Sequence, residues 1–293
     1  MKQTHDITPM KLTYDISTLV PYINWVYFYH AWQLRDENEK QRIRREAEAF
    51  LASVQDRYHA YALFLLADAY ADGDDIVVVR GEEQEVRGER IPCLRQQQVD
   101  SDFLCLADFI TPYPNYCPFH SPFTPPSLPL HSPKISLFAT SVDAGMEHDF
   151  DRDPYQKMMA QLLADRLAEA AAERMHEEVR KHYWGYAKDE NLSISEMLQE
   201  RFQGIRPAVG YPSLPDTSLN FLLDRLLNMQ QIGISLTENG AMRPHASVSG
   251  LMIANPEARY FSIGKIGEDQ LLDYARRRQM PVDTIRKFLS ANL

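Results

Sequence analysis

The sequence predicts an α+β fold in which helices and antiparallel strands are mixed along one chain. Helical and strand patterns both occur, but they do not follow the regular βαβ alternation from which parallel sheets are built. The longest amphipathic segment, residues 153–183, has one apolar face at helical spacing. Three strand patterns follow one another between residues 234 and 266, and the turn signal Asn255-Pro256 joins the last two.

The first part of the chain is predicted to be loose and then rich in aromatic side chains. Residues 1–13 are polar and carry no periodic pattern, so we expect a loose segment there. Residues 17–32 follow, with six aromatic residues between Tyr22 and Trp32. Such a cluster is most often part of a core, but it can also form a groove wall for a planar ligand, since Asn24 and His30 add polar groups.

Two helices and two strands are expected next. Apolar residues at helical spacing predict a charged amphipathic helix over residues 35–57. The apolar run after it predicts a second helix to about Ala71, which Gly73 ends. Residues 74–80 are rich in valine and predict a strand, and the charged segment 81–90 leads through a turn into another strand.

Residues 112–133 interrupt these patterns with eight of the chain's 18 prolines. Proline lacks a backbone N–H and fixes φ, so the segment can form neither a helix nor a central strand. We expect an irregular surface loop rather than a linker between domains, because residues 134–142 again form a strand pattern that needs a sheet to join.

The second half of the chain is predicted to begin with the long helix, which Pro154 suits at its first turn. Ser193 and Glu196 form a capping box for a helix that ends near Phe202. Asp216 or Thr217 caps a further helix through Leu227. Beyond it we expect three strands and two terminal helices, the second of which opens at Pro281; the strands are residues 234–242, 247–255 and 259–266.

Composition narrows the function. A 293-residue chain with 44% apolar and 25% charged residues is a globular protein of one extended domain or two modest ones. Its net charge of −10 disfavours binding to phosphate backbones, so we expect no nucleic acid partner. The most apolar stretch, residues 61–71, is too short to span a bilayer, and the N-terminus lacks a signal-peptide core. We therefore expect a cytoplasmic protein without a membrane segment.

Several common catalytic and metal signatures are absent. The chain contains no GxGxxG after a strand, no GxxxxGK, no GxSxG and no HExxH, and Arg180 stands where residues 176–180 would need the second histidine of a zinc protease. The three cysteines, Cys93, Cys105 and Cys117, fit neither a disulfide framework nor a zinc site. We expect no protein-bound metal.

Two local features could form a binding site. In residues 204–212, GIRPAVGYP, two prolines stiffen the segment, two glycines permit close approaches, and Arg206 could pair with a carboxylate. The alternative is a plain connection between helices with a solvated arginine. Glu169 lies seven residues after Leu162 on an apolar row of the long helix. Its carboxylate could be shielded and partnered, or it could line a cleft for a cation, or the helix face could simply turn toward solvent there.

Longer stretches of the sequence resemble those of a known protein family. Residues 165–212 closely resemble the C-terminal activation domain of cobalamin-dependent methionine synthase, and RPAVGYP matches the RxxxGY motif with which that family binds S-adenosylmethionine. The resemblance is collinear from about residue 14 to the C-terminus. Further matching segments are YINW (22–25), LRQQ (94–97), CLADF (105–109), HYWGYA (182–187), ENLS (190–193), LTENGAM (236–242), ASVSG (246–250) and DYARR (273–277).

The resemblance implies one C-shaped α+β domain over residues 14–293, built around a bent antiparallel sheet flanked by helices. It implies that S-adenosylmethionine lies in a shallow groove on the inner face. By matched position, Arg206 would bind the ligand's carboxylate and Glu169 would add a polar contact. The family commonly has an aspartate at position 24, so Asn24 keeps an acceptor but loses a charge. The remaining expected binding residues are Ala208, Gly210, Tyr211 and Tyr260.

The function implied by the resemblance is the reactivation of methionine synthase by reductive methylation. Cobalamin oxidised to cob(II)alamin receives an electron from a flavodoxin-like donor and a methyl group from S-adenosylmethionine. The protein needs no acid or base, so no catalytic side chain is expected; it acts by positioning. The chain has no DxHxxG motif for cobalamin, no zinc-cysteine set for homocysteine and no folate barrel. A partner, the cobalamin-binding module of methionine synthase, would carry the cobalamin.

Two alternatives remain from the sequence. One is a non-catalytic protein that docks on a corrinoid protein without delivering methyl groups, which Asn24 favours and the retained Arg206, Gly210 and Tyr211 oppose. The other is a reactivator of a different corrinoid methyltransferase.

Overall fold

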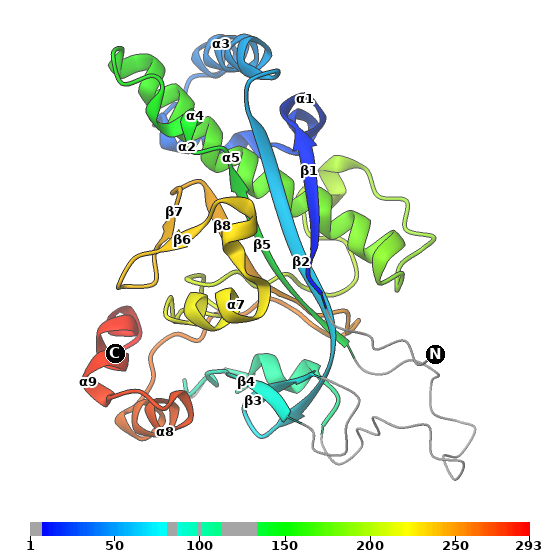
Figure 1. Cartoon of the computed structure of the whole chain (residues 1–293), viewed down its shortest axis with the longest axis vertical. Coiled ribbons are helices and arrows are strands. Elements are labelled where there is room, and N and C mark those ends of the chain that lie inside the picture. The colour runs from blue at the N-terminus through cyan, green and yellow to red at the C-terminus, as the bar shows by residue number, and fades with distance from the viewer. Residues whose placement is uncertain (1–7, 81–86, 99–100, 113–133) are drawn as a thin grey trace.

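A six-stranded antiparallel sheet forms the centre of the molecule (Figure 1). The structure is a computed structural model that describes residues 8–80, 87–98, 101–112 and 134–293. The strand order is β4-β3-β2-β5-β8, and β1 pairs with the first half of β2. The strands are β1 (Met10–Asp15), β2 (His59–Asp72), β3 (Asp75–Arg80), β4 (Arg87–Pro92), β5 (Lys134–Val142) and β8 (Ser247–Met252).

The long strand β2 corrects the prediction of an apolar helix ending near Ala71. Its side chains alternate between two hydrophobic clusters: Ala60, Ala62 and Phe64 join one, and Leu63 and Leu65 join the other. Because both faces are covered, the strand reads as a nearly continuous apolar run, which periodicity alone does not distinguish from a buried helix. Gly73 ends the element as expected, but as the turn into β3.

The expectation of a loose N-terminal segment is wrong for residues 10–13, which belong to β1. This strand pairs with β2 from Met10 opposite Phe64 to Asp15 opposite His59. Its apolar residues Met10, Leu12 and Tyr14 alternate with polar ones, but the pattern covers only six residues, and Tyr14 alone is buried. Residues 1–7 and most of the proline-rich segment 112–133 lie outside the described residues.

Helices cover both faces of the sheet. The long helix α5 (Pro154–Glu178) packs on β2, β5 and β8 together with the N-terminal helices, and α7 (Leu219–Leu227) packs on the opposite face. Alanines on α5 allow a close approach to the sheet, so that the Thr140 hydroxyl donates a hydrogen bond to the backbone oxygen of Ala168 at 2.9 Å. The N-terminal helices are α1 (Ile16–Leu19), α2 (Trp25–Ala31) and α3 (Glu37–Val54), and α4 (Gly145–His148) precedes α5.

Most of the predicted helices are confirmed with shifted ends. The helix predicted over residues 35–57 is α3, and the one predicted over 153–183 is α5, continued by a π-helical turn at Val179–Tyr183. The capping box of Ser193 and Glu196 opens α6 (Ile194–Leu198), which is shorter than expected. Helix α7 has Ser218 as its N-cap, one or two residues after the predicted Thr217 or Asp216. The terminal helices are α8 (Glu268–Arg278) and α9 (Val282–Phe288), which opens after Pro281 as predicted.

The three predicted C-terminal strands are only partly confirmed. Residues 234–242 contribute β6 (Ser235–Leu236), which pairs with β7 (Met242–Arg243), and residues 247–255 contain β8. Residues 259–266 do not form a strand. A long-range contact holds this segment instead: the amide of Ile263 donates to the backbone oxygen of Pro212 at 2.9 Å.

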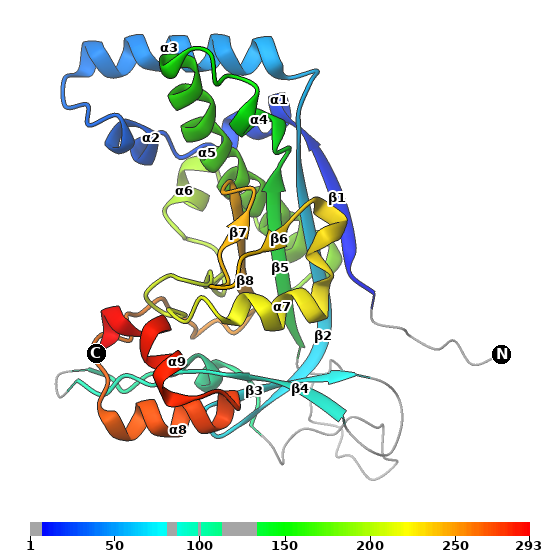
Figure 2. The same ribbon diagram turned by 60° about the vertical axis from the view of Figure 1, so that its left-hand side comes forward.

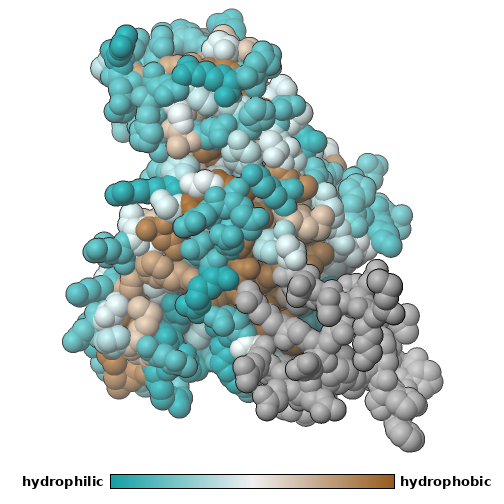
Figure 3. Space-filling model, viewed as in Figure 1, coloured by the Kyte–Doolittle hydropathy of each residue, from teal (hydrophilic) through white to brown (hydrophobic). Residues whose placement is uncertain are grey.

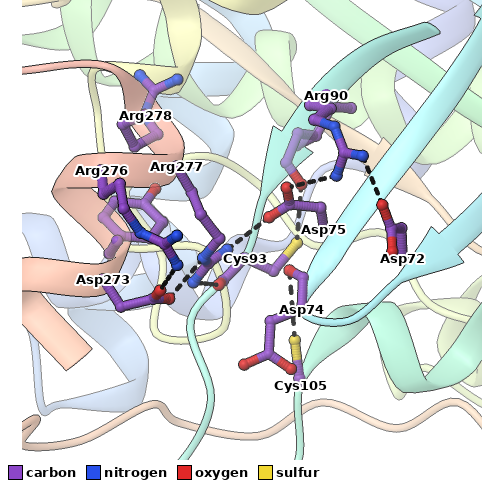
Figure 4. A network of polar contacts seen from close by, with 12 residues as sticks. Asp72, Asp74, Asp75, Arg90, Cys93, Cys105, Asp273, Arg276, Arg277 and Arg278 are labelled. Atoms are coloured by element: carbon purple, nitrogen blue, oxygen red, sulfur yellow. Dashed lines mark hydrogen bonds and ion pairs between the residues drawn. The ribbon is translucent and has the colours of Figure 1, made fainter. Parts of the chain in front are cut away.

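A charged network ties α8 to the hairpin of β3 and β4 (Figure 4). The buried carboxylate of Asp75 accepts hydrogen bonds from Arg277 at 2.6 Å and from Arg90 at 3.0 Å. Two arginines on one buried carboxylate offset the cost of removing it from water. Cys93 and Cys105 lie beside this network as free, buried thiols, and Cys117 lies outside the described residues.

Together these elements give the C-shaped outline that the resemblance implies (Figure 2). Helices α2 and α3 at one end, and α8 and α9 at the other, project to the same side of the strands. Hydrophilic residues dominate the surface of the end that carries α3 (Figure 3), where the helix turns its charged face outward. Across the part of the chain that the structure describes, no helix has the length and apolar character needed to cross a membrane.

Candidate functional site

A groove of about 640 Å³ lies between α2, α5 and the segment that contains GIRPAVGYP. It brings together residues that are more than 200 positions apart in the sequence. Six of the seven predicted binding residues line it: Asn24, Glu169, Arg206, Ala208, Tyr211 and Tyr260. The seventh, Gly210, lies in the same loop between two lining residues but is not itself part of the wall.

Helix α5 forms one wall of the groove with a single row of side chains. Arg166, Glu169, Ala172 and Glu173 follow one another at helical spacing and all line it. The opposite face of α5 is buried against the sheet. The sequence-based choice between a cleft and a solvent-turned face at Glu169 is therefore resolved in favour of the cleft.

The loop 204–212 is fixed to the sheet by backbone pairing with β8. The amides of Leu251 and Val209 donate to Pro207 and Ser249 at 3.0 and 2.9 Å, so the loop runs beside β8 like a short extra strand. Gly250 permits this approach, because a Cβ at that position would lie 2.2 Å from the backbone oxygen of Pro207. Gly210 has a φ of +88°, a conformation that other residues rarely adopt. The rigid loop inferred from the sequence is confirmed.

Arg206 is held by α5 and is not the solvated arginine of the alternative interpretation. Its guanidinium donates to the backbone oxygen of Ala172 at 2.8 Å and to the carboxylate of Glu173. Its side chain is 13% exposed. Burial acts to lower the pKa of Arg206, but Glu173, Tyr260 and Glu169 outweigh it and raise that pKa, so the side chain stays charged.

Glu169 is partnered and borders the open part of the groove. It accepts a hydrogen bond from Arg166 at 2.8 Å and a longer one from the Tyr211 hydroxyl at 3.4 Å. Burial raises the pKa of the Glu169 carboxyl, and the charges of Arg166 and Arg206 only partly offset that effect. Its side chain keeps 31% of its exposure, so the carboxylate is shielded yet reachable by a ligand.

Asn24 and Tyr260 complete the predicted set from opposite sides of the groove. The Asn24 side-chain oxygen caps α2 by accepting the Val26 amide at 3.2 Å. The Tyr260 hydroxyl accepts the Arg206 amide at 2.9 Å, and burial raises the pKa of its phenol. Tyr260 thus helps to fix the backbone of Arg206, while α5 holds the guanidinium of the same residue.

Twelve lining residues were not among the predicted binding residues, and five of these carry charged or phenolic side chains: Tyr22, Tyr27, Arg166, Glu173 and Glu200. Two of them could have been found, because Arg166 and Glu173 lie three residues before and four residues after Glu169 on one helix. Glu200 gave no such signal. It follows the short helix α6 with a φ of +59°, unusual for a residue other than glycine, and burial together with Glu173 raises the pKa of its carboxyl.

The aromatic segment near Trp25 serves both roles that the sequence left open. Phe28 is fully buried in the core, whereas Tyr22 and Tyr27 line the groove. Among the described residues there is no group of three or more histidine, cysteine or acidic side chains arranged to hold a metal ion.

The groove and the fold can be compared with known proteins. The family model for the activation domain of vitamin B12-dependent methionine synthase matches residues 15–279. The crystal structure of the MetH reactivation domain bound to AdoHcy is similar to this chain with a TM-score of 0.87 and 35% sequence identity. That match covers 99% of this chain and 91% of the other.

These comparisons confirm the resemblance first carried by RPAVGYP and its accompanying motifs. They extend over the sheet, over α5 and over the loop that presents Arg206, which are the elements that build the groove. This chain therefore belongs to the activation domain family of vitamin B12-dependent methionine synthase.

Proposed function

We propose that this chain binds S-adenosylmethionine in the groove and supplies its methyl group when methionine synthase is reactivated. The observation that carries the proposal is Arg206, a charged side chain fixed on α5 at one end of a groove large enough for a nucleoside-sized ligand. The similar MetH reactivation domain binds AdoHcy, the demethylated form of the same ligand.

Each end of the ligand finds a chemically suitable partner. Arg206 has five N–H donors and uses only two of its nitrogens in its contacts with α5, so it can also bind the ligand's carboxylate. Glu169 borders the groove as an acceptor and attracts a cationic ligand. We assign further contacts to Asn24, Ala208, Gly210, Tyr211 and Tyr260.

The chemistry requires positioning rather than proton transfer. A sulfonium makes its methyl group an electrophile, and a cobalamin carried by the partner would supply the nucleophile after one-electron reduction, with S-adenosylhomocysteine as the leaving group. The residues of this chain bind the ligand, direct its methyl group toward the open side of the groove and limit the access of water. The partner is the cobalamin-binding module of methionine synthase, a flavodoxin-like protein is the electron donor, and the cytoplasm is the expected compartment.

A second candidate function is that of a docking protein without methyl transfer. Asn24 favours it, because this side chain carries no charge for the ligand's ammonium group and its oxygen already caps α2. The two functions differ in whether the isolated chain binds S-adenosylmethionine.

Calorimetry on the isolated chain tests the proposal. We expect binding of S-adenosylmethionine, and we expect Arg206→Ala to weaken it by about ten- to a hundredfold, since a charge-assisted hydrogen bond contributes roughly 1.5–3 kcal/mol. Arg225→Ala is the matched control, because Arg225 pairs with Glu89 and does not line the groove. An absence of binding heat at millimolar ligand, with the protein folded, would favour the docking function.

A further inference from the structure

Two exposed tyrosine rings stand on different elements that line the groove, and the proposed function uses only one of them. Tyr27 on α2 is 58% exposed and Tyr211 in the loop is 52% exposed, and both line the groove. We call them the tyrosine pair. Val26, next to Tyr27 on the same helix, is exposed to the same degree but does not line the groove.

Helix α5 holds both rings through one pair of charged residues. The Arg166 guanidinium lies 5.8 Å from the centre of the Tyr27 ring, and the Tyr211 hydroxyl donates to Glu169. Arg166 in turn donates to Glu169 at 2.8 Å, so the four side chains form one connected row.

Arg166 and Glu169 precede Ala172 and Glu173 on α5, so the row lies on the N-terminal side of the site that holds Arg206. Arg206 donates to the backbone oxygen of Ala172 and to Glu173, whereas Tyr27 lies over Arg166. Seven residues separate Arg166 from Glu173, which is about 10 Å along a helix axis. An S-adenosyl amino acid carries its carboxylate and its purine base at opposite ends. A ligand whose carboxylate lies on Arg206 and which extends along α5 therefore brings its base to the tyrosine pair.

We propose that Tyr27 stacks on the purine base of the ligand, with Tyr211 on the opposite side of the base. This inference rests on the proposed function and adds to it a residue that determines recognition of the base. An aromatic ring left half in water has an accessible π-face, and stacking a base on it replaces that water contact. The cation beside Tyr27 keeps the ring in place without covering it.

The test uses S-adenosylhomocysteine and four forms of the full chain: the wild type, Tyr27→Ala, Tyr27→Phe and Val26→Ala. Calorimetry gives the dissociation constant, and the loss of intensity of the adenine absorption band on binding reports stacking directly. We expect Tyr27→Ala to raise the dissociation constant about five- to a hundredfold and to reduce the absorbance change. Tyr27→Phe keeps the ring and should recover most of the affinity, and Val26→Ala should bind like the wild type.

The outcomes separate this inference from the proposed function. If the wild type does not bind the ligand, the proposed function fails and the inference fails with it. If the wild type binds and Tyr27→Ala matches it in affinity and in absorbance change, only the stacking assignment is wrong. If Tyr27→Ala binds more weakly but keeps the full absorbance change, the ring does not stack on the base. If Val26→Ala weakens binding as much as Tyr27→Ala does, α2 only shapes the groove. Either result would overturn the assignment.

Discussion

Arg206 is oriented before a ligand arrives, because α5 and Tyr260 fix both its guanidinium and its backbone. A ligand carboxylate then meets a donor that has already lost most of its rotational freedom, which lowers the entropic cost of binding. The same helix row places Glu169 one turn away from Glu173. Substitutions at Asn24 on α2 and at Glu169 on α5 test how the two walls of the groove recognise the ligand.

Asn24→Asp should tighten the binding of S-adenosylmethionine. The aspartate keeps the side-chain acceptor that caps α2 and adds a negative charge toward the ligand's ammonium group. A partly exposed pair contributes about 0.2–1 kcal/mol, so calorimetry should show a gain of up to about fivefold that shrinks at high salt. An affinity that stays the same would remove Asn24 from the set of ligand contacts.

Glu169 should make the binding of the sulfonium ligand depend on pH. Burial raises the pKa of this carboxyl, so it ionises above the ordinary range of about 4–4.5. A charged Glu169 attracts the sulfonium, and a neutral one does not; the affinity should therefore rise as the pH increases through the raised pKa. Dissociation constants measured across pH should show this rise, more weakly for the uncharged thioether of S-adenosylhomocysteine.

Glu169→Gln is the control for that pH dependence. Glutamine keeps the shape and a hydrogen-bond acceptor but does not titrate, so the step should disappear from its profile. The same step in the variant would assign it to another group, of which Glu200 is the nearest candidate because the pKa of its carboxyl is also raised.

At the residue scale, the sequence led to the site through the family motif and less through periodicity. Arg206 and Tyr211 belong to a motif, and Glu169 lies on an apolar row, so all three were available from the sequence. Glu200 and Tyr22 reach the groove only because the chain folds back on α5, which no local pattern encodes. The sequence places Glu173 on the long helix, but its ion pair with Arg206 could not be predicted, because it depends on where the loop packs against that helix.

At the scale of elements, the pairing of the loop with β8 determines where Arg206 lies. Gly250→Ala should disturb that pairing, because the new Cβ would meet backbone atoms of Pro207 and Ala208 at 2.2 and 2.8 Å, which cannot move independently. Overpacking of this kind costs about 1–3 kcal/mol. Denaturant unfolding should show the loss of stability, and calorimetry should show weaker ligand binding, since Arg206 moves with the loop.

Gly73→Ala is a suitable comparison for that variant. Gly73 also has a conformation that disfavours alanine, with a φ of +60°, but no atom lies within 4 Å of the added Cβ and the turn is far from the groove. It should lose about 1–2 kcal/mol of stability and keep its affinity for the ligand. If both variants keep their affinity, the position of the loop does not depend on the close approach at Gly250.

Elements were predictable where their pattern was local. The capping box at Ser193, the amphipathic face of α5 and the start of α9 at Pro281 depend on neighbouring residues and are confirmed. Strand β2 was assigned to the wrong class because its two buried faces remove the alternation that marks a strand. Residues 259–266 have a strand composition but pair with no strand of the sheet, and a long-range contact with Pro212 holds them instead.

At the scale of the whole molecule, the C-shaped outline leaves one side of the strands open toward a partner. We expect this chain to transfer a labelled methyl group from S-adenosylmethionine to a cobalamin-bearing partner inactivated as cob(II)alamin, in the presence of an electron donor. The cobalt absorption spectrum and the transferred label measure the reaction. Docking should be transient and polar, because the partner must leave for ordinary turnover.

The control omits this chain from the same mixture. Equal recovery of methylcobalamin without it would contradict the reactivation role, whereas ligand binding without any transfer would direct attention to a different corrinoid protein as partner. Arg206→Ala should slow the transfer at low ligand concentration and approach the wild-type rate at saturation, if its role is to bind the carboxylate.

The long strand β2 has a consequence for how the molecule unfolds. Its alternate side chains belong to the hydrophobic clusters on the two faces of the sheet, and its two halves pair with β1 and β3. If one half of the molecule unfolds alone, β2 loses either its hydrophobic contacts on one face or its hydrogen bonds to β1 or β3. The other half of the molecule is then destabilised. This single strand of fourteen residues therefore links the two halves in unfolding, and we expect a ligand that binds on α5 to stabilise the β3–β4 hairpin as well.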